Sequence, residues 1–264
     1  MTVMCFQLLK KESSLMADVR AVLGVISLLS LSGCASISSA ERDPGDPHEG
    51  FNRSMYEFNE DLDRAVLKPV ATAYTDTLPQ PVRTGVSNFY DNLTYLDTTI
   101  NSFLQGKVVQ GASDLGRFIV NTTLGIAGIF DVATYMGLDK HDEDFGQTLA
   151  VWGVREDQYL MYPVLGPSSV RDTGGVIVSM LTNPVFYAAA PVAVPLGILQ
   201  GVDLRARKEG FVRFRDEAAL DPYLFTRDSY MQHREFEIFD GNLPRRSIYD
   251  EPVEPTPLPG NPAQ

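Results

Sequence analysis

The feature that most restricts the fold of this chain is a long uncharged stretch, which runs from residue 173 to residue 202. Sequence of this kind suits either a buried helical core or a surface that faces lipid. Pro184, Pro191 and Pro195 interrupt the stretch, and each lacks the backbone N–H that a continuous helix requires. We therefore expect a broken helical element immersed in a membrane surface, and not a single membrane-spanning helix.

A second uncharged run, Phe118–Phe130, contains Gly125 and Gly128, which predict bends or a mobile hairpin. Taken alone, both runs fit two interpretations equally well. They could form the buried core of an ordinary helical domain, or they could face a bilayer. A covalent membrane anchor would favour the second interpretation, because a body held against a bilayer can bury apolar faces in it.

The N-terminus carries the signals of such an anchor. Residues 21–31 form an apolar run that follows basic residues and is too short to cross a bilayer. Leu31–Cys34 then resembles a lipobox, so we predict a signal peptide over residues 1–33 and lipid attachment at Cys34. Ala35 favours release to the outer membrane, by similarity to bacterial lipoproteins. The alternative is a plain secretory leader or an N-terminal helix in which Cys34 has no role.

The net charge of the chain is -12, which excludes nucleic acid as a natural partner and disfavours electrostatic adhesion to anionic lipid. Membrane contact must then come from apolar surface or from the anchor. The two cysteines, Cys5 and Cys34, cannot form a disulfide framework for the rest of the chain, so the fold must be held by packing.

Four segments place apolar residues at helical spacing. The first begins at Asp46, Pro47 and Glu49, which fit the N-cap and first-turn positions, and it should end before Lys68 and Pro69. Its apolar face would carry Phe51, Met55, Phe58, Leu62 and Val66. The other segments are 79–93, 107–124 and 221–240, the last of them followed by Gly241 as its C-cap residue.

Only Tyr159–Val164 resembles a strand, so the predicted fold class is mainly α. Residues 46–241 should form one helical domain. Residues 34–45 are small and polar and should act as a flexible tether. The last residues, 242–264, are rich in proline and should be extended and disordered.

Three sequence motifs could indicate catalysis or metal binding, but each has a better explanation. Asp144–Gly146 spells a kinase metal-binding tripeptide, but the chain has no Gly-rich phosphate loop to accompany it. His141–Asp144 could suggest a metal site, yet adjacent residues cannot all face one ion, so a solvated acidic loop is the preferred interpretation. A lipid hydrolase would need a GxSxG motif, which is missing, and Ser168 is better explained as a helix N-cap. We therefore expect no catalytic residue, no metal and no cofactor.

The opening of the body, Asp46–Arg53 (DPHEGFNR), resembles that of the MlaA/VacJ lipoproteins. Further blocks follow in that family's order at 79–93, 101–107, 117–133, 144–154, 166–175 and 221–234. The resemblance implies a ring-like arrangement of helices partly embedded in the inner leaflet of the outer membrane, with a central channel. It also implies retrograde transport: phospholipids misplaced in the outer leaflet pass through the ring to a soluble periplasmic carrier. Trimeric outer-membrane porins are the implied neighbours.

The resemblance and the residues together suggest two sets of site candidates. The segment Asp131–Phe145 is expected to be a hairpin beside the channel whose mobility controls access. The candidates for this hairpin or for the channel are Gly128, Asp131, Tyr135 and Gly137. The candidates for headgroup contact are Arg117, Arg171 and Asp172, although such residues more often make surface ion pairs. Two other functions stay open, namely an envelope scaffold that stabilises porins without moving lipid, and a lipid hydrolase.

Overall fold

A computed structural model describes residues 46–154 and 158–243, so the predicted leader, the anchor at Cys34, the tether and the proline-rich tail lie outside the described residues. The elements in chain order are α2 (Glu49–Leu62), the π-helix η1 (Asp63–Leu67), α3 (Lys68–Thr77), α4 (Gln80–Leu104), α5 (Val108–Thr123), α6 (Val132–Tyr135), α7 (Phe145–Val151), β1 (Tyr159–Tyr162), β2 (Gly166–Ser169), α8 (Val170–Thr182), the 3-10 helix η2 (Pro184–Tyr187), α9 (Ala190–Arg207), α10 (Glu209–Ala218) and α11 (Pro222–Ile238). The prediction of a mainly α fold is confirmed.

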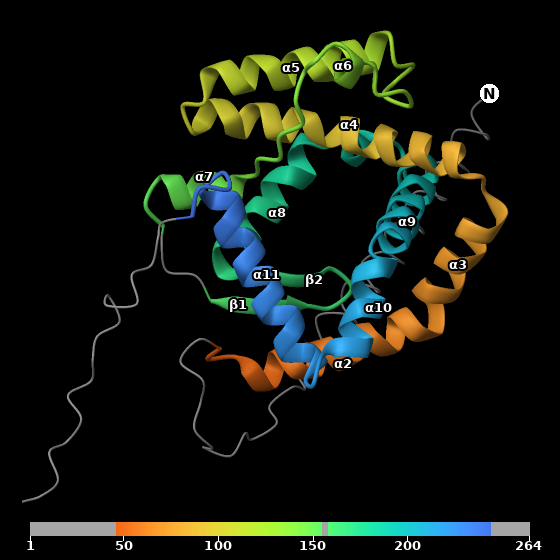
Figure 1. The fold of residues 1–264 in the computed structure, drawn as a ribbon, viewed down its shortest axis with the longest axis vertical. Coiled ribbons are helices and arrows are strands. Elements are labelled where there is room, and N and C mark those ends of the chain that lie inside the picture. Colours follow the sequence, from red (N-terminus) through yellow and green to blue (C-terminus); the bar gives the residue numbers. More distant parts are fainter. Residues whose placement is uncertain (1–45, 155–157, 244–264) are drawn as a thin grey trace, which may run out of the picture.

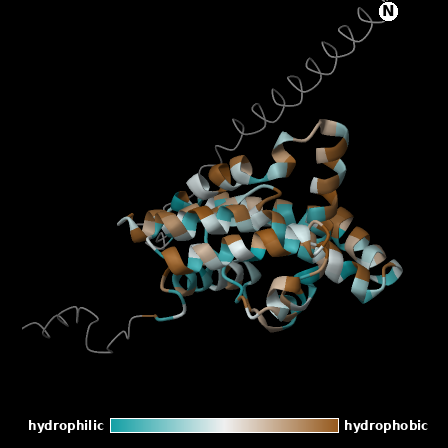
Figure 2. Ribbon diagram, turned by 90° about the horizontal axis from the view of Figure 1, so that it is seen from above, coloured by the Kyte–Doolittle hydropathy of each residue, from teal (hydrophilic) through white to brown (hydrophobic). Residues whose placement is uncertain are grey.

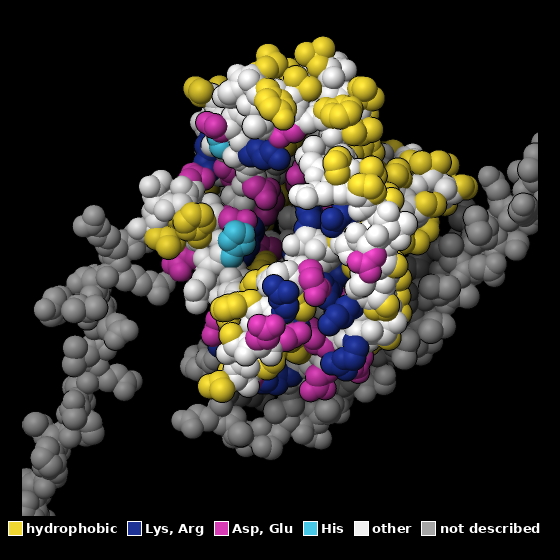
Figure 3. All heavy atoms as spheres, turned by 45° about the vertical axis from the view of Figure 1, so that its right-hand side comes forward, with side chains coloured by type: hydrophobic (Ala, Val, Ile, Leu, Met, Phe, Trp, Pro, Cys, Tyr) yellow, Lys and Arg dark blue, Asp and Glu magenta, His cyan; other side chains and the backbone are white. Residues whose placement is uncertain are grey.

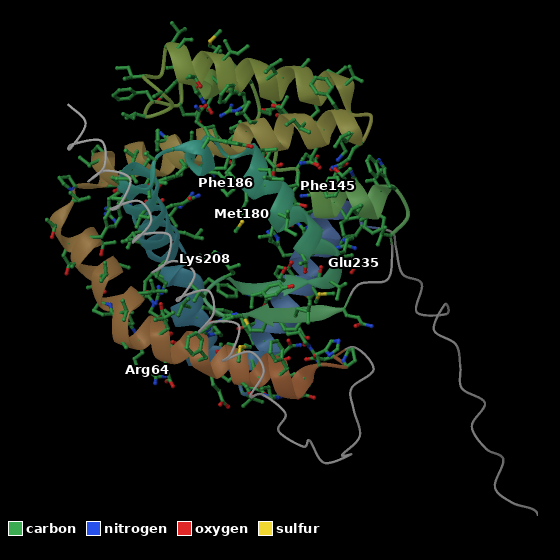
Figure 4. All side chains as sticks on the ribbon, turned by 180° about the vertical axis from the view of Figure 1, so that it is seen from behind. Arg64, Phe145, Met180, Phe186, Lys208 and Glu235 are labelled. Carbon is green, nitrogen blue, oxygen red and sulfur yellow. The ribbon has the colours of Figure 1, made fainter. Side chains whose placement is uncertain are left out.

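The helices follow one another in a ring (Figure 1), and its centre stays open when the side chains are drawn (Figure 4). In this view α2 and α3 form the lower and right-hand arc, α4 the upper arc, and α8 and α11 the left-hand side. The α9–α10 arm runs just inside α3, and the α5–α6 segment lies outside α4. The predicted ring-like arrangement is therefore present.

The junction between α2 and α3 corrects one boundary. The first helix was expected to end before Lys68 and Pro69, but the helical path continues through both residues by way of η1. Lys68 donates its N–H to the carbonyl of Asp63, five residues earlier, as in a π-helix. The wider turn makes room for the ring of Pro69, which would clash in a regular α-helix. Proline therefore bends this arc without ending it.

The start of α2 also differs from expectation. Asp46 does not cap the helix, whose N-cap is His48 with no side-chain hydrogen bond. The Asp46 side chain is instead buried, where it accepts hydrogen bonds from Asn52 and from the hydroxyl of Tyr223. A residue that looked like a local capping signal therefore joins α2 to α11.

The other predicted helix starts are confirmed with small shifts. Helix α4 follows Pro79, and α5 packs antiparallel against it. Asp221 caps α11 by accepting the N–H groups of Tyr223 and Leu224. The predicted C-cap residue is wrong, because Phe239 is the C-cap and Gly241, with a positive φ of 77°, lies two residues beyond it.

The strand prediction was partly right. β1 spans Tyr159–Tyr162 and pairs antiparallel with β2, Gly166–Ser169, which the sequence did not reveal. Because Ser168 belongs to β2, its predicted role as a helix N-cap is wrong. The neighbouring Ser169 caps α8, since its hydroxyl accepts the N–H of Asp172.

The long uncharged stretch is broken as predicted, into α8, η2 and α9. Its large apolar side chains are exposed, among them Ile177, Phe186 and Ile198, which are each about 60% exposed (58%, 58% and 64%). The interpretation of this stretch as an ordinary buried core is therefore wrong. None of the helices over 46–154 and 158–243 is both long and apolar enough to cross a bilayer.

Large apolar side chains are exposed and polar side chains are buried, which is the reverse of the distribution in a typical soluble protein. Among the described residues no Leu, Ile or Phe side chain is buried, and the small apolar clusters rest mainly on tyrosines such as Tyr74, Tyr159 and Tyr223. The buried side chains are mostly polar or charged. Apolar and polar residues alternate along the same helices (Figure 2). Burial of polar groups is favourable only when they are hydrogen-bonded, so the interior must be a connected polar network.

Candidate functional site

The ring is closed by pairs of guanidinium and carboxylate groups. Arg205 of α9 makes two parallel contacts with Asp63 of η1, at 2.6 and 3.0 Å. Arg215 of α10 contacts both oxygens of Glu60 in α2, at 2.7 and 2.8 Å. Both arginines are buried, so water screens these pairs less than surface pairs. Further joints are Arg53–Asp221 and Arg207–Asp91.

Arg234 joins α11 to the neighbouring helices α7 and α8. Its guanidinium contacts Asp144, the N-cap of α7, at 2.8 and 3.0 Å and Asp172 of α8 at 2.7 and 2.9 Å. Tyr230 donates a further hydrogen bond to Asp172. Burial alone would lower the pKa of Arg234, but the two carboxylates raise it above its ordinary value. Gly146 lies so close that an added Cβ would approach Asp172 to 2.1 Å. The Asp144–Gly146 tripeptide is therefore part of this joint.

Two of the headgroup candidates lie in the same place. Arg171 and Asp172 occupy the first turn of α8 and are 7% exposed each, so they do not form the expected surface ion pair. Burial would raise the pKa of Asp172, but hydrogen bonds and the charge from Arg234 hold it below its ordinary value. Headgroup contact by these residues stays a prediction, whereas their contacts assign them to the ring joint.

The segment from the end of α5 to Gly137 holds the channel and hairpin candidates. Gly128 and Asp131 lie in the loop before α6, Tyr135 is the last residue of α6, and Gly137 follows that helix. Ile126, Ala127 and Gly128 have positive φ angles of 53°, 56° and 89°. A Cβ at Gly128 would come within 2.4 Å of the Asn92 side chain in α4, so only glycine fits there. The loop thus follows a tight path across the surface of α4.

Arg117 of α5 holds this segment in place through its side chain. Its side chain is fully buried in α5 and donates to Tyr95, to the backbone carbonyl of Leu138, to Asp131 at 2.8 Å and to Thr134 at 3.2 Å. Because no part of the side chain reaches the surface in this conformation, Arg117 acts here by positioning the loop. Its predicted contact with a headgroup remains untested.

Asp131 is the other half of this contact. Partial burial would raise the pKa of Asp131, but hydrogen bonds from Thr134 and Asn121 and the charge of Arg117 lower it to about 2. The Asp131 carboxylate also caps α6 by accepting the N–H of Thr134. Asn121 accepts the N–H of Ala133 as well, so the start of α6 is held at several points.

The tip of the hairpin, in contrast, is open. Tyr135 is 92% exposed, and a Cβ added at Gly137 meets nothing within 4 Å. Gly137 has a φ of 78°, which makes glycine favourable there for conformational reasons alone. Gly128, Asp131, Tyr135 and Gly137 therefore lie in one segment built around the short helix α6, with a fixed base and an exposed tip.

The returning arm of the hairpin is not the solvated acidic loop that the sequence suggested. Glu143 is 3% exposed and accepts hydrogen bonds from Lys107, Gln105 and Gln110. His141 lies 2.8 Å from the carboxylate of Asp114. Within residues 46–154 and 158–243, no group of three or more His, Cys, Asp or Glu side chains could hold a metal ion.

A largely apolar cavity of about 1120 Å³ adjoins the loop. Asp131 and Tyr135 border it, together with Ile129 and Phe130. The N-terminal half of α4 forms its long wall, and Leu196 and Leu199 of α9 close it, in line with the hydrogen bond from Tyr90 to the carbonyl of Leu196. The volume is slightly above the range of small-molecule pockets, which hold roughly 300–1,000 Å³.

On the face shown in Figure 3, hydrophobic side chains gather along the upper and right-hand margin and charged side chains gather toward the middle and lower part. Sequence inspection missed the residues that organise this separation, above all Arg234, Asp144 and Asn121. The apolar helices with single arginines were a usable signal, because an arginine beside apolar neighbours needs a buried acceptor. Its partner could not be read from the sequence.

Comparison with known proteins agrees with this architecture. The family model described as "MlaA lipoprotein" matches residues 44–237. The chain belongs to the MlaA lipoprotein family. Curated MlaA relatives include the "Intermembrane phospholipid transport system lipoprotein MlaA" of Escherichia coli (strain K12), 37% identical over 81% of this chain and 86% of the relative. The protein of the same name from Haemophilus influenzae is 30% identical over 83% of this chain and 90% of the relative.

A solved structure is also similar in three dimensions. It was reported as "Structural basis for maintenance of bacterial outer membrane lipid asymmetry". The match has a TM-score of 0.64 and 35% sequence identity, and it covers 75% of this chain and all of the other chain (100%). The ring is thus a property that this chain shares with a solved structure.

Proposed function

We propose that this protein removes phospholipids from the outer leaflet of the outer membrane and passes them to a soluble periplasmic carrier. It belongs to a family whose curated members are named for intermembrane phospholipid transport. In this proposal Cys34 carries the lipid anchor on the periplasmic side of the outer membrane, a trimeric porin is the neighbour in the bilayer, and the carrier is the periplasmic lipid-binding component of the same system.

The observation that carries the proposal is the reversed polarity of the ring. Its exposed apolar side chains suit hydrocarbon, and its charged side chains gather away from that apolar margin, toward the middle of the face shown in Figure 3. A phospholipid that leaves a leaflet must keep its charged headgroup out of hydrocarbon, because burying a bare charge there costs several kcal/mol. A ring with an apolar rim and a polar centre meets this requirement.

The hairpin is the proposed point of control. Its base is held by Arg117 and Glu143, so only the tip around Tyr135 and Gly137 is free to move beside the cavity. Replacing Gly137 with a bulky residue should change the amount of phospholipid in the outer leaflet. Unchanged levels in a stably produced variant would count against control by the tip.

The transport proposal is tested by deleting the gene and measuring the phospholipid that an externally added phospholipase can reach in intact cells. We expect accessible phospholipid to rise, and to return to the starting level when the gene is restored. If porin abundance falls instead, with no change in accessible phospholipid, the protein is a scaffold. Site-specific crosslinking from exposed residues such as Ile198 tests the porin contact.

Two further measurements examine the anchor and the absence of catalysis. A palmitate label should appear on the natural protein and disappear from a Cys34→Ser variant. Purified protein should release neither fatty acid nor lysolipid from phospholipid vesicles, in line with a transport role that needs no catalytic residue. Release of either product would support a hydrolase.

A further inference from the structure

One face of α9 borders the opening of the ring. Val202 packs on Ala71 and Tyr74 of α3, which lies on the outer side of α9 (Figure 1). Successive residues of an α-helix are about 100° apart, so some side chains must point the opposite way. Leu199 and Ala206 pack on the same cluster as Val202, and the residues on the side away from these three are Gly197, Gly201, Leu204 and Lys208. A Cβ added at Gly197 or Gly201 meets nothing within 4 Å, so this face adjoins open space.

Lys208 is the charged residue of this face. It lies at the junction of α9 and α10, and Figure 4 labels it on the side toward the opening, whereas Arg64 is labelled on the outer perimeter. The neighbouring cations are neutralised, since Arg205 contacts Asp63 and Arg207 contacts Asp91. Among the described residues no carboxylate forms an ion pair with the Lys208 ammonium group.

Two observations describe the surroundings of the Lys208 side chain. Its side chain is exposed to solvent. Even so, desolvation by the surrounding protein lowers its pKa, and the adjacent charge of Arg207 lowers it further. An exposed ammonium group with no carboxylate partner is free to contact an anion that enters the opening.

We propose that Lys208 contacts the phosphate group of a glycerophospholipid as the headgroup passes through the ring. This inference rests on the proposed transport function and assigns the headgroup contact to a residue that the sequence did not suggest. Lysine is a compact charge on a flexible stem, which suits a passing phosphate better than a rigid two-point contact would. The rest of this acidic chain repels phosphate, so an unneutralised cation on the inner wall gives the headgroup a preferred position.

The test uses the full acylated protein in detergent with two probes that carry identical fluorescent tails. One probe is phosphatidylethanolamine, and the other is diacylglycerol, which lacks the phosphate. We expect Lys208→Gln to lower the retained phosphatidylethanolamine about five-fold, as for loss of one charge-assisted contact that water partly screens. Retained diacylglycerol should be unchanged, and Lys208→Arg should retain phosphatidylethanolamine as the natural protein does.

Arg64→Gln is the matched control, because it removes one exposed positive charge from the outer perimeter. It should leave both probes unaffected, and circular dichroism should show the natural helix content in every variant. Equal phosphatidylethanolamine retention by Lys208→Gln and the natural protein would overturn the contact while leaving transport intact. Parallel loss of both probes would also overturn it, because the phosphate would then be irrelevant. A natural protein that retains neither probe would contradict the transport function itself.

Discussion

Two buried arginines use the same chemistry for different purposes. Apart from Tyr95, Arg117 takes its partners from a short stretch that follows it, of which Asp131 lies 14 residues away. Arg234 gathers Asp144 and Asp172 from 90 and 62 residues earlier in the chain. The first arginine therefore fastens a loop to the helix beneath it, and the second joins helices that are far apart in the sequence. Loss of Arg117 should destabilise mainly the neighbouring loop, whereas loss of Arg234 should destabilise the whole fold.

The largest effect is expected from Arg234→Ala. Removal of the guanidinium leaves two carboxylates, Asp144 and Asp172, close together and uncompensated, which destabilises a fold by about 3–5 kcal/mol. The free energy of unfolding in detergent, followed by far-UV circular dichroism, should fall by that amount. As a control, Arg64→Ala breaks an exposed pair with Asp61 and should change it by less than about 0.5 kcal/mol. Similar values for the two variants would show that Arg234 does not close the ring.

Arg117→Ala should have a smaller and more local effect, of about 3 kcal/mol or less, because its partners can still reach water at the loop surface. Hydrogen exchange should accelerate over residues 124–138, which the Arg117 contacts hold, while α11 keeps its protection. Equal acceleration in the loop and in α11 would erase the distinction between the two arginines.

Two glycines compare the fixed base of the hairpin with its open tip: Gly128 lies at the base and Gly137 at the tip. Gly128→Ala combines an unfavourable positive φ with a close contact to Asn92, so we expect a loss of about 2 kcal/mol or more. Gly137→Ala meets only the conformational penalty of about 1 kcal/mol, because the space around it is open. Thermal unfolding of both variants gives the comparison, and a larger loss for Gly137→Ala would contradict the picture of a fixed base and an open tip.

The smallest effect concerns pH. The pKa of Asp131 is lowered to about 2 in the folded protein, so its ionised form contributes stability that is present above the ordinary pKa near 4 and disappears as pH falls toward 2. After allowance for screening we expect about 1 kcal/mol. The difference in unfolding free energy between the natural protein and Asp131→Asn should thus be full at pH 6 and shrink below pH 4. A difference that grows on acidification would show that the carboxylate is not stabilised by Arg117.

How much of this could be predicted from the sequence depends on the range of the interactions. The starts of α4 and α11 were predicted because proline and Asp221 act on their own helix turns. The apolar spacing of α2 was also evident, but spacing cannot tell whether a helix face meets a core or a lipid, and Phe51 and Phe58 prove to be exposed. The break expected before Pro69 failed because a π-helix accommodates it.

The candidate site was predictable to a similar degree. The residues of the loop were found together because they are adjacent in sequence and punctuated by glycine. The partner of Arg117 lay close enough to be suspected, whereas the pairing of Arg234 with Asp172 requires the finished ring. Lys208 had no local signal at all, since its significance comes from the missing carboxylate and from the side of α9 on which it lies.

The two-point contacts of Arg205 with Asp63 and of Arg215 with Glu60 have a mechanical consequence. Apolar surfaces can slide past one another at little cost, because hydrophobic attraction has no preferred direction. A planar guanidinium that meets a carboxylate through two parallel hydrogen bonds accepts only a narrow range of angles. Helices joined in this way resist rotation about their contacts, so the diameter of the ring is set by bond geometry. In the proposed position within a leaflet, these contacts would keep the ring from collapsing under lateral pressure.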